Sequence, residues 1–430
     1  MAAKLRRLGL LDVFAIGLNA IVGSGVFAMG DKMHRAMGGY SPLAYALCAL
    51  FLMPVALCFA ELAAHNDATG GPYLYATKAF GPALGYIVGW SAWLNSFISW
   101  AAVTTLVVGL TGIAHDHVTS TLIVVGVILT LGVVNYIGVR PGAKVIQAVV
   151  VGKIVAILCF VGVALVSPKV GNVGGELPAH LHGFGTGVYL ALFPFQGFEV
   201  VAVPAGETKN PERNMPIGTL GALALAAVLY VVVQTLLELT YPDIGKETHV
   251  ALVDAAYFLG PRIGMIVFVG SLVSLGGFTA GSALGSPRYA QAMATEKQLP
   301  EALARIHPRF QTPHLAIAVT TAAAVVLACV VGDYEKLVGI SNVTIVFQYA
   351  FSCAAVLVLR KQRGETEAQK RGFRVPLGPV LPIVGAIGSI AFLGGAKEED
   401  FVHAAYMLAA GIPVAFISKY VLDRQPKPSP

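Results

Sequence analysis

The sequence predicts an all-α integral membrane protein with twelve transmembrane helices: a five-plus-five inverted repeat with broken helices 1 and 6, plus two additional helices. Three observations favour this fold. The 430-residue chain is 56% hydrophobic and 12% charged, with a mean hydropathy of +0.73, which excludes a soluble protein with a polar surface. Its apolar runs are as long as membrane spans, because a helix crosses the hydrocarbon in about 20 residues. Two runs, separated by four ordinary ones, carry helix-breaking residues at their centres.

Twelve apolar runs lie between charged or Pro/Gly-rich segments, and each is long enough to span a bilayer. The expected spans are residues 10–36, 40–63, 80–111, 119–137, 143–166, 184–206, 216–240, 257–289, 314–332, 335–359, 376–395 and 400–421. They divide the chain into five parts. These are a cytoplasmic N-terminus at 1–9, a first five-helix repeat at 10–166, a second five-helix repeat at 184–359, helices 11 and 12 at 376–421, and a disordered cytoplasmic tail at 422–430.

The distribution of basic residues predicts the orientation of the chain. With a cytoplasmic N-terminus and twelve crossings, 21 of the 29 lysines and arginines fall on the cytoplasmic side and seven outside, with Lys153 inside a span. Cytoplasmic loops carry such an excess. We therefore expect a multi-pass protein of the cell membrane with both termini cytoplasmic. Because the basic residues are spread over several loops without a reader motif, they do not indicate a nucleic-acid partner.

The first expected span is interrupted by Gly23-Ser24-Gly25. Glycine destabilises a helix interior by roughly 1 kcal/mol relative to alanine. Non-helical backbone at membrane depth is tolerated only where protein or a watery cavity pairs with its amides and carbonyls. The segment therefore indicates either a break that lines a binding site or a small-residue face for helix packing.

The sixth expected span carries a second interruption, at Pro194, Gln196, Gly197 and Glu199. Proline removes a backbone donor and clashes with the preceding turn, while Gln196 and Glu199 place polar groups at membrane depth. Two interrupted helices at the first position of each five-helix half are typical of inverted-repeat secondary transporters. This pairing favours a binding site over simple helix packing.

Lys153 lies about ten residues inside the fifth expected span. A lysine at mid-membrane costs ~2.5–3.5 kcal/mol even on the milder insertion scales, so such residues usually face the bundle interior and serve a pathway or pair with a partner. The alternative is that the span boundary is misplaced and Lys153 lies near an interface.

An intramembrane enzyme needs a nucleophile with its base, a metal set, or an acid–base pair at membrane depth. The sequence has no HExxH motif, no GxSxG motif and no paired aspartates within a span. We therefore expect no enzymatic activity, no cofactor and no metal site.

Short motifs in several spans and loops share one order with a known family. In chain order they are Ile21-Val22-Gly23-Ser24-Gly25-Val26-Phe27, Phe59-Ala60-Glu61-Leu62, Gly70-Gly71-Pro72-Tyr73-Leu74-Tyr75, Gly197-Phe198-Glu199 and Gly206-Glu207-Thr208-Lys209-Asn210-Pro211. Each is weak alone, but the order and spacing are specific. Over about residues 8 to 420 the chain resembles the amino acid, polyamine and organocation (APC) superfamily of transporters, and within it the amino acid permeases.

The resemblance implies that the carboxylate of an amino acid substrate meets backbone amides at Gly23, Ser24 and Gly25. This agrees with the physics of a helix break, because the amino end of a half-helix offers unpaired N–H groups and a positive dipole end. No charged side chain is needed there.

The resemblance also implies acceptors for the substrate ammonium. These are carbonyls freed at the two breaks, near Ile21 in helix 1 and near Phe193 and Gln196 in helix 6. Phe278 matches an aromatic position of helix 8 that closes over the substrate in relatives.

Lys153 matches a helix-5 lysine whose ammonium, in many relatives, replaces a coupling sodium between helices 1 and 8. Burial disfavours the charged form of a lysine, so its proton can become linked to the side on which the cavity opens. The proton is therefore the expected coupling ion. Glu199 matches a carboxylate treated in the family as proton-responsive, and a structural hydrogen-bond acceptor at the helix-6 break is the alternative role.

These features favour proton-coupled uptake of neutral amino acids by alternating access, with the amino acid and the lipid bilayer as partners. No acidic residue other than Glu199 is expected deep among helices 1, 3, 6, 8 and 10, so a cationic side chain would lack a partner. Two alternatives stay open: an exchanger or importer of cationic amino acids or polyamines, and a non-transporting amino acid sensor. The sequence does not indicate the oligomeric state.

Overall fold

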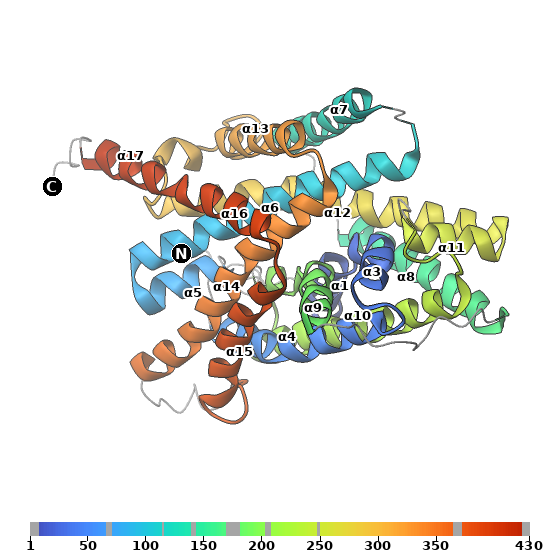
Figure 1. The fold of residues 1–430 in the computed structure, drawn as a ribbon. Helices are drawn as coiled ribbons and strands as arrows, with labels where there is room; N and C mark the ends of the chain where they lie inside the picture. The colour runs from blue at the N-terminus through green and yellow to red at the C-terminus, as the bar shows by residue number, and fades with distance from the viewer. Residues whose placement is uncertain are drawn as a thin grey trace.

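The computed structural model describes residues 8–65, 71–113, 116–138, 143–168, 181–202, 208–246, 250–363 and 372–423. Within these ranges the chain is built from helices joined by short connections (Figure 1). In chain order they are α1 (Leu10–Ile21), α2 (Gly25–Ala28), α3 (Gly30–Met37), α4 (Ser41–Ala64), α5 (Gly71–Phe80), α6 (Pro82–Thr111), α7 (His117–Tyr136), α8 (Ala143–Val166), α9 (Leu181–Phe195), η1 (Phe198–Ala202), α10 (Pro211–Thr240), α11 (Ala251–Leu259), α12 (Pro261–Thr295), η3 (Glu301–Ala304), α13 (His314–Val330), α14 (Tyr334–Arg363), α15 (Val380–Ala391), η4 (Phe392–Gly395), α16 (Glu398–Ala409) and α17 (Gly411–Asp423).

Some sequence predictions fall outside the described residues. These are most of the cytoplasmic N-terminus (1–7), the tail beyond residue 423, Gly70 and the Gly206-Glu207 part of the last family motif.

Among the described residues, eight stretches are long and apolar enough to cross a membrane. They are Leu10–Ala28 (α1 and α2), α4, α6, α7, the Gln147–Val166 part of α8, α10, α12 and the Tyr334–Gln362 part of α14. Two shorter apolar helices, α13 and the stretch of α15 and η4, add to these. In its described ranges the chain is all-helical, with the long apolar helices of a membrane protein.

Six of the twelve expected spans are shorter or interrupted in the structure. Two of these interruptions were expected: the 10–36 span is divided into α1, α2 and α3, and the 184–206 span into α9 and η1. The 400–421 span is divided between α16 and α17. The 314–332 and 376–395 spans correspond to the short helices α13 and α15 with η4.

The 257–289 span also differs. Gly260, with φ +152°, separates α11 from the 35-residue α12. Pro261 opens α12 because its fixed φ suits the first helical position.

The broken helices lie at the centre of the packing. α1 packs against α10 and α8, α10 packs against α4, and α6 packs against α12 and α14. Figure 1 shows α1, α3, α9 and α10 in the middle of the molecule, with α7 and α13 together at one edge. Peripheral helices expose large apolar side chains, including Val118, Leu122, Leu129 and Val133 of α7. Such a surface suits lipid, whereas in water it would favour aggregation.

An ion pair ties together the ends of α4 and α14. The buried carboxylate of Glu61 accepts from Arg360 at two atoms, Nε at 2.7 Å and Nη2 at 2.5 Å. It also accepts from the Val375 amide at 2.7 Å. Glu61 belongs to the family motif Phe59-Ala60-Glu61-Leu62, so this motif has a structural role in the described chain.

We predict that Arg360→Ala destabilises the protein, because it leaves the buried Glu61 carboxylate without its charged partner. The cost of breaking such a pair is about 3–5 kcal/mol. Thermal unfolding of the purified protein in detergent measures it, with Lys361→Ala, at the exposed neighbouring position, as the control. Equal melting temperatures for the two variants would contradict the prediction.

Candidate functional site

The first break lies where the sequence places it. α1 ends at Ile21, α2 begins at Gly25, and Val22 leaves the helical region with ψ of 76°. The Ile21 carbonyl accepts from the Gly23 amide at 2.8 Å. The amides of Gly25 and Val26 open α2 and therefore have no partner within that helix. Unpaired donors are thus available at this break.

The second break is also present. α9 ends at Phe195 and the 3-10 turn η1 starts at Phe198. Gly197 has φ +117°, a conformation that favours glycine. Its amide donates to Glu199 Oε2 at 2.9 Å, and Tyr349 Oη on α14 donates to the same oxygen at 3.0 Å. Glu199 therefore has the hydrogen bonds expected of a structural acceptor at the break.

The two breaks pack directly on each other. A Cβ added to Gly197 would lie 2.6 Å from the carbonyl carbon of Ala20, and a Cβ added to Gly25 would overlap the ring of Pro194. Tyr230 on α10 joins them as well, because its buried hydroxyl lies 2.8 Å from the Ile21 carbonyl oxygen and 3.0 Å from that of Pro194. The crossing is possible only with glycine at these two positions.

Lys153 is fully buried and lies ten residues after the first residue of α8. Its Nζ donates to the Val22 carbonyl at 2.7 Å, to Asn19 Oδ1 at 2.9 Å and to the Asn19 carbonyl at 3.2 Å. Ser274 on α12 reaches the same Val22 carbonyl at 3.3 Å. The ammonium thus lies at the carboxyl end of α1, where the helix dipole favours a cation.

Gln196 is held by a polar network. Its Nε2 donates to Asn342 Oδ1 at 2.8 Å, while its Oε1 accepts from Ser341 at 3.1 Å and from Asn95 at 3.3 Å. Ser341 also donates to Asn95 Oδ1 at 2.7 Å. The side chain therefore has a fixed orientation at the break between α9 and η1.

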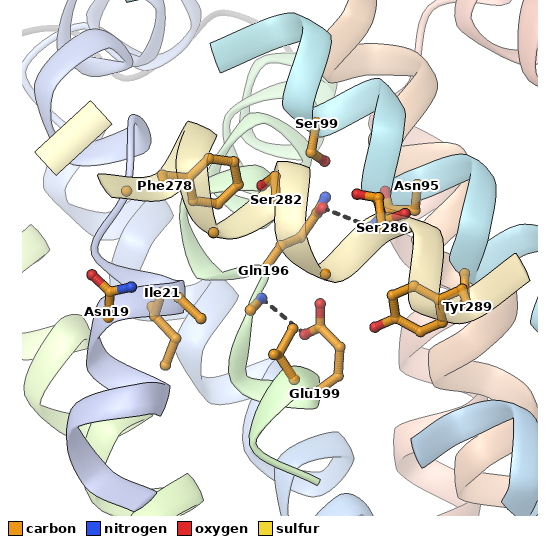
Figure 2. A pocket seen from close by; sticks show the side chains of 18 of the residues that line it. Asn19, Ile21, Asn95, Ser99, Gln196, Glu199, Phe278, Ser282, Ser286 and Tyr289 are labelled. Carbon is orange, nitrogen blue, oxygen red and sulfur yellow. Dashed lines mark hydrogen bonds between the residues drawn. The ribbon is translucent and has the colours of Figure 1, made fainter. Parts of the chain in front are cut away.

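A cavity of about 680 Å³ lies where the two breaks meet. All seven residues expected to bind substrate line it: Ile21, Gly23, Ser24, Gly25, Phe193, Gln196 and Phe278. Glu199 lines it too, whereas Lys153 is not among the lining residues. Figure 2 shows Phe278, Ser282 and Ser286 following one another along α12 on one wall, with Ile21, Gln196 and Glu199 across from them.

One end of the cavity is closed. The Tyr334 hydroxyl lies 3.4 Å from Ser24 Oγ, and the ring of Phe193 packs edge-on against Tyr334. Beyond this layer, Glu335 pairs with Lys32 of α3. In the other direction the cavity extends along α12 past Ser286 to Tyr289 and Met293, and it reaches Tyr73 of α5. The cavity is thus asymmetric.

The tryptophans of α6 do not line the cavity. Trp90 donates to the Met407 carbonyl on α16, and Trp93 donates to Thr320 on α13. The cavity is lined instead by the small and polar positions of α6: Gly89, Ala92, Asn95, Ser96 and Ser99.

Sequence reasoning missed Tyr230 and Ser286. A tyrosine in an apolar span has no local signal that it pairs with breaks elsewhere in the chain. Ser286 lies just beyond the small-residue run of α12, where helix packing is the more common interpretation.

Comparison with known proteins agrees with this geometry. The model of the amino acid permease family matches residues 8–410. The chain belongs to the amino acid permease family. It is 30% identical to the serine/threonine exchanger SteT of Bacillus subtilis over 96% of both chains. It is 26% identical to the branched-chain amino acid permease BcaP of the same organism, over 96% of this chain and 92% of that one.

A third relative is named for a different class of substrate. The permease is 27% identical to the mouse cationic amino acid transporter 4, over 84% of this chain and 61% of that one. These matches confirm the resemblance to the APC superfamily, and the family and its members are transporters rather than enzymes.

We predict that Tyr230→Phe weakens the contact between the two breaks, because the hydroxyl proton shared by the Ile21 and Pro194 carbonyls is lost. A buried acceptor left unsatisfied costs about 1–3 kcal/mol. The melting temperature of the purified permease should fall by several degrees. Tyr406→Phe, on an exposed part of α16, is the matched control and should melt like the wild type. A Tyr230→Phe variant as stable as this control would show that the hydroxyl is not needed at the breaks.

Proposed function

We propose that this permease is a secondary transporter that moves neutral amino acids across the cell membrane by alternating access. The cavity at the meeting point of the two helix breaks is the observation that carries the proposal. The substrate carboxylate would accept hydrogen bonds from the amides at Gly23, Ser24 and Gly25, since the amino end of a half-helix suits an anion.

The ammonium would lie against the carbonyls near Ile21, Phe193 and Gln196. The Ile21 carbonyl already accepts from the Gly23 amide and the Tyr230 hydroxyl. A carbonyl oxygen has two lone pairs. Substrate would therefore exchange with one of these donors, most simply the Gly23 amide, whose single proton would turn from the Ile21 carbonyl to the substrate carboxylate. Phe278, whose ring packs against Gly23, would cover the substrate.

The neutral preference rests on charge. Glu199 is the one carboxylate among the described residues that line the cavity, and it already accepts from Gly197 and Tyr349. A cationic side chain would need that carboxylate released. The chain matches relatives named for neutral amino acids and a relative named for cationic amino acids. The identity of the substrate is therefore a question for experiment.

The proposed topology keeps the twelve-helix, five-plus-five inverted repeat with repeats at 10–166 and 184–359. The excess of basic residues on one side supports cytoplasmic termini. In that orientation α3 and the start of α14 face outside, and the cavity, closed at that end, extends towards the cytoplasm.

Proton coupling is proposed through Lys153. Protonated, its ammonium ties the end of α1 to α8 through the oxygens of Asn19 and Val22. A neutral amine would donate fewer and weaker hydrogen bonds, because charge-assisted bonds are roughly twice as strong. Loss of the proton would thus loosen α1. Glu199 is a second candidate for proton coupling, and no cofactor is required.

We predict that proteoliposomes containing the permease accumulate labelled alanine and that arginine and putrescine do not compete for it. The measurement is saturable uptake under an inward proton gradient, with protein-free liposomes as the control. Saturable arginine uptake without alanine uptake would overturn the neutral preference. Alanine binding without uptake under any gradient or exchange condition would favour a sensor.

We predict that Lys153→Gln abolishes the stimulation of alanine uptake by an inward proton gradient. Glutamine keeps a hydrogen-bond donor for Asn19 and Val22 but carries no titratable proton. Alanine counterflow at equal pH on both sides tests whether the variant still binds and moves substrate. Lys153→Ala should lose gradient stimulation too, with lower stability. A wild-type proton dependence in Lys153→Gln would remove the coupling role.

A further inference from the structure

The wall that α12 turns to the cavity holds a buried hydroxyl with no hydrogen-bond partner in the described chain, that of Ser286. Ser286 is only 1% exposed and lines the cavity. Two other hydroxyls of α12 are paired within their own helix: Ser271 donates to the Phe268 carbonyl and Thr279 to the Leu275 carbonyl. A buried hydroxyl left unpaired costs free energy, so its retention indicates a partner that is present only part of the time.

The same wall has room for that partner. A Cβ added to Gly281 or to Gly285 would meet no atom within 4 Å. Ser282 follows Gly281, and Ser286 follows Gly285, so each pair places a hydroxyl beside an open patch (Figure 2). We call this surface the α12 station: Gly281, Ser282, Gly285 and Ser286.

A cation, Arg288, lines the cavity beside the α12 station, and the Glu199 carboxylate lines the same cavity. Arg288 lines the cavity one turn from Gly285, and its Nη1 donates to Asn135 Oδ1 at 2.9 Å. Asn135 in turn donates to the Ala283 carbonyl at 2.7 Å, which fixes the amide that positions the guanidinium. Arginine and a hydroxyl are both good donors to a carboxylate.

The α12 station is separate from the helix breaks along the cavity. Phe278, which packs on Gly23, lies eight residues before Ser286 in the same helix. At 1.5 Å per residue this places the two side chains about 12 Å apart along α12. A small amino acid bound at the break amides is too short to reach Ser286.

We propose that the α12 station is a second binding position for the transported amino acid, occupied between the helix breaks and the end of the cavity at α5. Ser286, after rotation about χ1, donates its hydroxyl proton to the substrate carboxylate, and Arg288 supplies the neighbouring positive charge. This rests on the proposed transport function. On this proposal, the part of the cavity between the α12 station and α5 serves the passage of a zwitterion and does not hold a larger substrate side chain.

The first test fills the α12 station without touching the breaks. Gly285→Leu should leave alanine binding, measured as a thermal shift, within about threefold of wild type, and should reduce alanine uptake at least tenfold. Gly162→Leu is the matched control, since Gly162 is an exposed glycine of α8 that also has no neighbour within 4 Å. It should bind and transport like the wild type. Normal uptake by Gly285→Leu, or loss of binding together with uptake, overturns a separate station.

The second test probes the hydroxyl. Ser286→Ala should raise the melting temperature of the ligand-free permease, because an unpaired buried polar group is removed, and should lower alanine uptake by threefold or more. A purely structural serine would not combine these two changes. A stabilised variant with wild-type uptake overturns the role of Ser286.

The third test separates this proposal from the proposed function. In a Cys159→Ser, Cys329→Ser background, Gly285→Cys introduces a thiol into the α12 station, and its alkylation rate by a maleimide is measured with and without alanine. Alanine should still slow alkylation at least twofold when Ser24→Leu blocks the break amides. Protection that vanishes with Ser24→Leu overturns the second position. Failure of the wild type to bind alanine at all would instead overturn the proposed function.

Discussion

Backbone groups released at two helix breaks must find partners in a medium that offers no water. The rest of the structure depends on how this is done. Tyr230 reaches a carbonyl from each break, Lys153 reaches the end of α1, and Glu199 receives the amide of Gly197. These side chains come from α10, α8 and η1, so three separate parts of the chain hold the breaks open. Where the carbonyls are paired in this way, the first amides of α2 still have no partner within their own helix.

Close approach is the second half of the same constraint. The breaks cross at Gly197 and Gly25, where any side chain would collide with the other broken helix. Gly197 also has a positive φ, so at this position conformation and space both require glycine. The glycines therefore do more than weaken two helices. They let two stretches of backbone approach closely enough to share the Tyr230 hydroxyl. Larger residues would keep these stretches apart.

Features that depend on residues close together in the sequence could be predicted, and features that depend on distant residues could not. The breaks at Gly23-Ser24-Gly25 and around Pro194 are local, because glycine and proline act on their own turn. The burial of Lys153 follows from its apolar neighbours, and the cavity-lining positions came from the family resemblance. Tyr230 lies 209 residues from Ile21 and 36 from Pro194, so no local pattern relates them.

The same limit applies to the face that α6 turns to the cavity, and it explains why several span boundaries differ from the structure. Which side of α6 meets the cavity depends on α13 and α16, which take up Trp93 and Trp90. The length of an apolar run does not show where a helix ends. The Gly260-Pro261 junction was therefore not predicted, although glycine and proline are both helix-breaking residues.

The contacts that hold α1, α2 and α3 in place differ in strength, and burial explains the difference. Removing a partner from a buried charge such as Lys153 costs several kcal/mol. The pair of Lys32 and Glu335 at the closed end has side chains 18% and 42% exposed, and ion pairs of this kind are worth about 0–1 kcal/mol. Breaking the ion pair between α3 and α14 therefore costs little free energy, whereas separating Lys153 from the end of α1 costs much more.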